Sequence, residues 1–284
     1  MRSAVKKSTD DREAMLQKLA ACDKRTLAGL VALVELQSRA GDERADYLGY
    51  LEPVMRSDVS GLRVAERSYG VSWKQRGGKG AYHMLARKWE RIEKRVAERL
   101  PARADAPGAS AYDIFEHIAA DRMSDGLIDD VRDLRRYLLL IEAETRTWRA
   151  EEPELPFAPG PNWESRDFLD HLEPLAARDI ATIREKQASY GASWKRNGGI
   201  GAFMIFARKW DRIKNRVALD IEVRGSAPGA EREDVFQHIA ADARAEPVLD
   251  DIRDLRCFLL LLEAEMAARG AVTIGDARDN REKG

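Results

Sequence analysis

The sequence predicts an all-α protein made by tandem duplication of one helical module. Two observations support this prediction: a long segment recurs at a fixed offset, and apolar residues recur at helical spacing within each copy. No stretch combines sustained alternation of apolar and polar residues with turn dipeptides, so no β-sheet is expected. The two modules are expected to pack together as a pseudo-dimer, as two subunits of a homodimer would.

The repeat is aligned without gaps. The segment YGVSWKQRGGKGAYHMLARKWERIEKRVA begins at Tyr69 and returns from Tyr190 as YGASWKRNGGIGAFMIFARKWDRIKNRVA, an offset of 121 residues. Five segments follow from this alignment: an N-terminal helical extension (1–45), a first module (46–149), a proline-rich linker (150–166), a second module (167–270) and a disordered tail (271–284).

Apolar periodicity places the helices. One face of the helix that follows the glycines is apolar, with Tyr82, Leu85, Trp89, Ile92 and Val96 in the first module and Phe203, Phe206, Trp210, Ile213 and Val217 in the second. Another long helix is expected at 129–146, with Leu134, Leu138 and Ile141 on its inner face and Leu255, Leu259 and Leu262 as counterparts. Shorter helices are expected at 46–56, 58–68 and 111–122, and the extension is expected to hold one or two, including 27–37.

Composition excludes several classes of protein. Charged residues are 34% of the chain but nearly cancel, giving a net charge of -1, so general DNA binding and attraction to an anionic membrane are not expected. Cys22 and Cys257 are the only cysteines, and they are expected to be buried thiols rather than a disulfide or a zinc site. The N-terminus lacks an apolar signal core and no apolar run is long enough to span a bilayer, so a cytoplasmic location is expected.

A glycine-rich segment leading into a basic helix is the first candidate site. Glycines allow close approach of a ligand, and the helix expected to start near Ala81 offers unpaired N–H groups, which together suit a phosphate. The segment is neither a P-loop nor a dinucleotide fingerprint, and the alternative is a tight connection between helices with the tryptophans in the core. The residues expected to bind phosphate or stack a base are Tyr69, Trp73, Lys74, Gly77, Gly78 and Gly80, with Tyr190, Trp194, Lys195, Gly198, Gly199 and Gly201 as counterparts.

A basic stripe follows on the same helix. Arg87, Arg91 and Arg95 are four residues apart and therefore share one face, with Lys88 beside them, and the second module repeats the pattern as Arg208, Arg212, Arg216 and Lys209. Such a stripe needs an anionic partner. The candidates are a ligand phosphate or an internal ladder with the acidic edge of the later helix, formed by Asp129, Asp130 and Asp133 and repeated as Asp250, Asp251 and Asp254.

A histidine and an aspartate four residues apart form the third feature. His117 with Asp121 recurs as His238 with Asp242. The pair could help to hold a divalent metal or act as an acid/base couple, and the alternative is ordinary hydrogen bonding within a helix. No nucleophile stands out, so catalytic residues are not assigned.

The repeated motifs resemble those of a known group of domains. Tyr-Gly-x-Ser-Trp, the glycines, Arg-Lys-Trp-(Asp/Glu)-Arg-Ile and Asp-Asp-x-x-Asp-Leu are similar to small phage and bacterial domains called nucleotide-modification-associated, and more distantly to the all-α MazG-like nucleotide pyrophosphatases. The similarity covers roughly residues 69–100 and 127–145 and their counterparts. It implies magnesium bound by Asp130, Asp133, Asp251 and Asp254. The first magnesium helix of those enzymes matches Glu90-x-x-Glu93 in one module only.

Three functions therefore remain open. The leading hypothesis is binding of a nucleotide or other phosphorylated small molecule, one per module. The others are a magnesium-dependent nucleotide hydrolase and a helical scaffold for protein interactions. Whether the chain forms a homo-oligomer is also open.

Overall fold

The fold is described from a computed structural model, which covers residues 47–103, 106–151, 164–224, 229–242, 244 and 246–275, without the side chains of 148–151. These residues belong to one compact unit, 46–284. The chain is 73% helical, with eight α-helices and no strand in the part described, which confirms the all-α class. The predicted extension, its helix at 27–37 and Cys22 lie outside the described residues, as does most of the predicted linker.

The two modules contain the same elements in the same order. Those of the first are η1 (Tyr47–Tyr50), α3 (Leu51–Tyr69), η2 (Ser72–Lys74), α4 (Gly77–Val96), α5 (Ile114–Ala120) and α6 (Leu127–Glu151). Those of the second are η3 (Asp167–His171), α7 (Leu172–Tyr190), η4 (Ser193–Lys195), α8 (Gly198–Val217), α9 (Val235–Ala241) and α10 (Val248–Ala268). Each α-helix of the second module begins 121 residues after its counterpart. Duplication itself remains the interpretation of the sequence.

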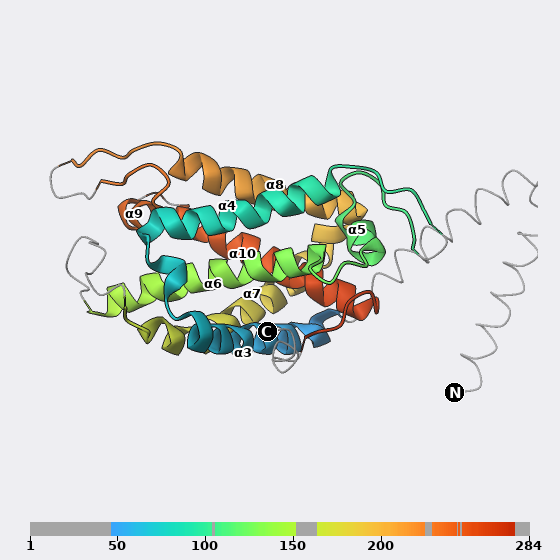
Figure 1. Ribbon diagram of the computed structural model, residues 1–284, viewed down its shortest axis with the longest axis horizontal. Helices are drawn as coiled ribbons and strands as arrows, with labels where there is room; N and C mark the ends of the chain where they lie inside the picture. Colours follow the sequence, from blue (N-terminus) through green and yellow to red (C-terminus); the bar gives the residue numbers. More distant parts are fainter. Residues whose placement is uncertain are drawn as a thin grey trace, which may run out of the picture. The chain divides into compact units, whose positions relative to one another are not determined.

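The long helices form three layers, each with one helix from each module (Figure 1). Helices α4 and α8 make one outer layer, α6 and α10 cross in the middle, and α3 and α7 make the other outer layer. The short helices are exchanged, because α5 packs on α8 and α9 packs on α4. Every layer is therefore a contact between the two modules.

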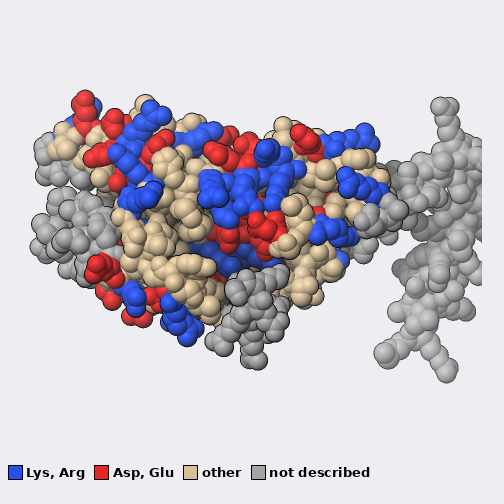
Figure 2. Space-filling model, viewed as in Figure 1, with Lys and Arg blue, Asp and Glu red and all other residues tan. Residues whose placement is uncertain are grey.

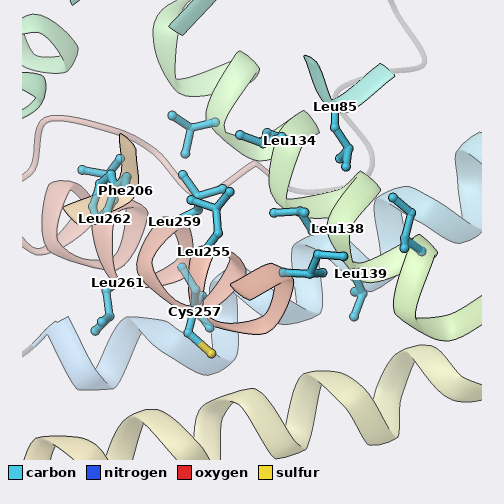
Figure 3. Packing of buried hydrophobic residues seen from close by; sticks show 14 of the residues in the cluster. Leu85, Leu134, Leu138, Leu139, Phe206, Leu255, Cys257, Leu259, Leu261 and Leu262 are labelled. Carbon is cyan, nitrogen blue, oxygen red and sulfur yellow. The ribbon is translucent and has the colours of Figure 1, made fainter. Parts of the chain in front are cut away.

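The predicted apolar faces form the core. All ten residues of the predicted face on α4 and α8 are at most 6% exposed, and the indoles of Trp89 and Trp210 stack with ring centroids 5.7 Å apart. Leucines of α6 and α10 converge in the middle layer, among them Leu134, Leu138, Leu255 and Leu259 (Figure 3). Cys257 is buried, as expected. No helix in the described ranges has both the length and the apolar character needed to cross a membrane.

Several predicted boundaries are wrong. The expected helices 46–56 and 58–68 are one helix, α3, because Asp58 is buried beside Arg135 and so does not mark a break. Helix α4 begins at Gly77, one turn before the expected start, and the expected helix 111–122 shortens to Ile114–Ala120, where Asp113 caps the first turn. Helix α6 extends beyond 129–146 at both ends.

The predicted disordered tail is wrong for its first residues. Ala271, Val272 and Ile274 pack against the core, and Ser57 donates a hydrogen bond to the carbonyl of Gly275. Because these contacts hold the backbone of 271–275 against α3 and the core, this stretch belongs to the fold. The remaining residues of the predicted tail lie outside the described ones.

Candidate functional site

The lysines expected to bind phosphate are buried in ion pairs. The Nζ atom of Lys74 lies 2.7 Å from Glu144 and donates to the carbonyl of Ser165, and its side chain is 0% exposed. Its counterpart Lys195 lies 2.8 Å from Glu265. Each ammonium also lies 5.0 Å from the centre of an aromatic ring. A ligand phosphate would have to displace these buried carboxylates, so the predicted role of both lysines does not fit this geometry.

The glycines serve a contact between the modules. A Cβ atom on Gly78 would lie 1.9 Å from Oδ1 of Asp234 and 2.8 Å from the amide nitrogen of Phe236, at the start of α9. Gly199 meets Asp113 and Phe115 at the start of α5 at the same distances. The expected loop is thus the first turn of α4 or α8, closed by the other module's carboxylate. A phosphate approaching these glycines would therefore meet a carboxylate of like charge within a few ångströms of Gly78.

The basic stripe forms the internal ladder. Arg91 and Arg95 lie 3.1 and 3.7 Å from carboxylate oxygens of Asp130, and Lys88 lies 2.7 Å from Asp133. Burial raises the pKa of Asp130, although these cations oppose the shift. The second module repeats the ladder through Lys209, Arg212, Arg216, Asp251 and Asp254. Figure 2 shows basic and acidic side chains intermingled on one face of the molecule instead of a continuous basic area.

Arg87 and Arg208, also predicted to bind a ligand, are exposed and stand outside the ladder. Tyr69 and Tyr190 are exposed as well, by 76% and 70%. The predicted lysines and arginines of both modules other than Arg87 and Arg208 are paired with carboxylates, and Gly78, Gly199 and Trp194 are buried. The structure therefore does not bring the predicted ligand residues together as one open site.

The histidine pairs do not form. The Nε2 atom of His117 is hydrogen-bonded to the carbonyl of Ser110, whereas Asp121 accepts the backbone N–H of Leu127 at the start of α6. His238 and Asp242 repeat this division of partners, with Asp242 capping α10 through Val248. Among the described residues, no group of three or more His, Cys, Asp or Glu side chains could hold a metal ion. The aspartates expected to bind magnesium face arginine and lysine instead.

A pocket beside the predicted site is open in the first module. It has a volume of about 410 Å³ and lies between α3, η2, α6 and η3. We call it the Trp73 pocket. Its walls are aromatic and apolar with a few polar groups, and its lining residues are Gly61, Leu62, Ala65, Glu66, Tyr69, Gly70, Ser72, Trp73, Asp133, Arg136, Tyr137, Leu140 and Phe168.

The second module has a smaller pocket at the equivalent place. It has a volume of about 140 Å³, and we call it the Trp194 pocket. Its lining residues are Ile183, Lys186, Gln187, Tyr190, Gly191, Ser193, Trp194, Asp254, Cys257, Phe258 and Leu261. Position 65, alanine in the first module, is Lys186 here, and position 61, glycine in the first module, is Thr182. The larger side chains of α7 narrow the second pocket.

Glu66 in the Trp73 pocket lacks a hydrogen-bond partner that its counterpart Gln187 has. Gln187 accepts a hydrogen bond from the hydroxyl of Tyr47. Glu66 is the counterpart of Gln187, but the counterpart of Tyr47 is Phe168, which has no hydroxyl to donate. The Glu66 side chain is only 9% exposed, and its Oε1 atom accepts no hydrogen bond within the described residues, although Arg166 lies 2.7 Å away. The buried indole Nε1 atoms of Trp73 and of its counterpart Trp194 are both without an acceptor among the described residues, so they do not distinguish the two pockets.

Sequence reasoning found part of this pocket. Tyr69 and Trp73 were predicted to contact a ligand, and both line the Trp73 pocket. Glu66, Arg136 and Phe168 were missed, because their motifs are not retained between the modules. The signal that could have found the pocket is divergence between the modules and not retention. Ala65 corresponds to Lys186 and Glu66 to Gln187, next to a retained tyrosine and tryptophan.

Comparisons with known proteins give no further guide to this pocket. A scan against protein-family models, a search of curated proteins and a search of solved structures each found no match.

Proposed function

We propose that this protein binds a small organic molecule in the Trp73 pocket. The observation that carries the proposal is the difference between two equivalent places of one fold: about 410 Å³ is open in the first module and about 140 Å³ in the second. A cavity of several hundred Å³ lined by aromatic side chains with a few polar groups has the character of a small-molecule site.

The walls define the kind of ligand. Leu62, Leu140 and Phe168 offer apolar surface, and Trp73 and Tyr137 add aromatic rings. The carboxylates of Glu66 and Asp133 line the same space, as does the guanidinium of Arg136, which is paired with Asp58. Because carboxylates repel anions, a neutral or cationic molecule with an apolar body fits this pocket better than a nucleotide phosphate.

The proposal differs from phosphate binding at the glycines. At that place the lysines are already neutralised by buried glutamates, and an aspartate of the other module closes on the glycine backbone. A phosphate there would lie beside an aspartate and would find no lysine charge left unpaired. We therefore retain small-molecule binding but place the site between α3 and α6 instead of at the start of α4.

The test follows the indole N–H signals of the six tryptophans by nuclear magnetic resonance. Indole, phenol, benzylamine, n-butylamine and benzoate are added in turn to the ¹⁵N-labelled full chain, with Trp73→Phe and Trp194→Phe used to assign the two signals. At least one neutral or cationic compound is expected to shift the Trp73 signal in a saturable manner. The Trp194 signal is the internal control and is expected to move less, because its pocket is smaller.

The steric control is Ala65→Lys, which gives the Trp73 pocket the residue of the second module. It is expected to abolish the shift, whereas Ser68→Lys, an equal change of charge at an exposed position of α3, is expected to preserve it. Absence of a saturable shift with every compound, or an equal response to both lysine variants, would contradict the proposal.

A further inference from the structure

We infer that the ligand of the Trp73 pocket carries a primary ammonium group, held by Asp133. This inference rests on the proposed function and specifies its ligand class. It follows from the second module, where a protein side chain supplies such a group at the equivalent place.

Asp254 shows the complete arrangement. Its Oδ2 atom lies 2.7 Å from Nζ of Lys209 on α8, and its Oδ1 atom accepts a hydrogen bond of 2.9 Å from Nζ of Lys186 on α7. Both lysines favour the ionised form of this carboxyl. They lower its pKa, although burial acts in the opposite direction. One carboxylate of the Trp194 pocket is therefore shared between two ammonium groups.

Asp133 has only the first of these partners. Its Oδ2 atom lies 2.7 Å from Nζ of Lys88, as in the second module. The second lysine is missing, because the counterpart of Lys186 is Ala65. Within the described residues the one ion pair of Oδ1 is with Nη1 of Arg136, 3.9 Å away, which is beyond hydrogen-bond distance. Arg136 instead donates to Asp58.

The absence of a lysine at position 65 leaves space in the first pocket and leaves the Asp133 carboxylate with one lysine instead of two. The first module has Ala65 where the second has Lys186, so its pocket wall lacks the four-carbon stem and the ammonium group of a lysine. The cavity is larger in the first module. The first module also has Glu66 in place of Gln187, a second carboxylate, whose Oε1 atom is ion-paired with Arg166 at 2.7 Å and accepts no hydrogen bond among the described residues. An ammonium has three N–H donors and no acceptor, so it can take the place of Lys186 beside the Oδ1 atom of Asp133, whose side chain is 39% exposed.

The aromatic walls suit the same ligand. Trp73, Tyr137, Tyr69 and Phe168 line the pocket, and the faces of such rings attract alkylammonium groups. The first module already uses this interaction once, since Nζ of Lys74 lies 5.0 Å from the centre of the Phe168 ring. The ligand that best replaces the missing lysine is an amine with an alkyl chain of about four carbons.

The test is a titration of the full chain with n-butylammonium chloride, followed by the Trp73 indole signal and by calorimetry. n-Butanol is the neutral control of equal shape. We expect n-butylammonium to bind at one site and n-butanol at least tenfold more weakly. Asp133→Asn is expected to weaken the binding of n-butylammonium at least tenfold and to leave that of n-butanol unchanged.

Variants of the two modules give a second readout that does not depend on Asp133. Lys186→Ala is expected to open the Trp194 pocket and raise the stoichiometry from one to two, with Asp254 as the new acceptor. Ala65→Lys is expected to reduce it to none. Melting temperatures of both variants test whether the fold is retained, and unchanged stoichiometry in both folded variants would overturn the inference.

Failure of the ammonium inference differs from failure of the proposed function. Equal binding of n-butanol and n-butylammonium, both abolished by Ala65→Lys, would overturn the inference that the ligand carries an ammonium group. It would leave the pocket as a binding site for small molecules. Absence of binding for every compound would overturn both. Nα-acetyl-lysinamide distinguishes the sources of the group: tighter binding than n-butylammonium would identify a lysine of a polypeptide, and weaker binding a free amine.

Discussion

Burial decides what Lys74 does in this protein. Its ammonium is enclosed with Glu144, the carbonyl of Ser165 and the ring of Phe168, which belongs to the second module. The sequence shows a retained lysine next to a tryptophan and glycines, a pattern equally suited to a phosphate site. It does not show that a glutamate 70 residues away reaches the same point, because side-chain contacts at that separation depend on how helices pack.

Removal of one partner leaves a buried charge alone. Lys74→Met is therefore expected to lower the free energy of unfolding by about 3–5 kcal/mol. Denaturant unfolding followed by circular dichroism measures the loss. Lys79→Met is the control, because its ion pair with Glu231 is exposed and little change is expected. Equal stability of wild type and Lys74→Met would contradict the structural role given to this lysine.

At the scale of elements, the sequence predicts faces well and contacts between helices poorly. The apolar residues of α4 repeat every three or four positions, and those positions are buried. The glycines at the start of α4 have no such periodicity. Their role depends on α9, which approaches from the other module and places Asp234 and Phe236 against Gly78. The start of α4 was therefore predicted as a ligand loop.

A methyl group on Gly78 would overlap Asp234 and the backbone of Phe236. Gly78→Ala is expected to lower the free energy of unfolding by about 1–3 kcal/mol, as overpacking does. Gly61→Ala is the matched control, since the nearest atoms to its Cβ would be those of the Arg136 guanidinium at 3.3 Å and not backbone, and alanine favours a helix by up to about 1 kcal/mol. Chemical denaturation of both variants tests this contrast, and equal effects would contradict the docking of α9 on α4.

At the scale of the whole molecule, buried charges join the two modules in a reciprocal manner. Arg256 of α10 donates to Asp179 of α7 and to Glu142 of α6, and Arg135 of α6 donates to Asp58 and Glu263 in the same pattern. The sequence predicted pairing of the modules from their repetition. It could not predict these partners, because none of the acidic residues stands at a fixed helical spacing from its arginine.

Glu142 makes this connection sensitive to acid. Burial acts to raise its pKa, but Arg256, Arg253 and Arg178 outweigh burial and lower the pKa to about 2. A carboxyl with a lowered pKa in the fold stabilises it above the pKa of the unfolded chain, and this contribution is lost as the pH falls towards the folded value. The free energy of unfolding is therefore expected to fall by about 3 kcal/mol, from this carboxyl alone, as the pH is lowered from about 5 to about 2.

Unfolding by urea at a series of pH values measures this dependence. Glu142→Gln is expected to be less stable at neutral pH and to lose less stability than the wild type on acidification. Parallel pH profiles of the two proteins would show that Glu142 does not carry the dependence.

A small molecule is expected to bind between α3 and α6 of the first module and not at the glycines. A thermal-shift comparison of wild type, Ala65→Lys and Ser68→Lys against nucleotides, neutral aromatics and alkylamines tests it most directly. A saturating ligand raises the melting temperature, because it binds only the folded state. We expect a shift with amines or neutral aromatics that Ala65→Lys alone abolishes. Stabilisation by nucleotides in all three proteins would contradict it.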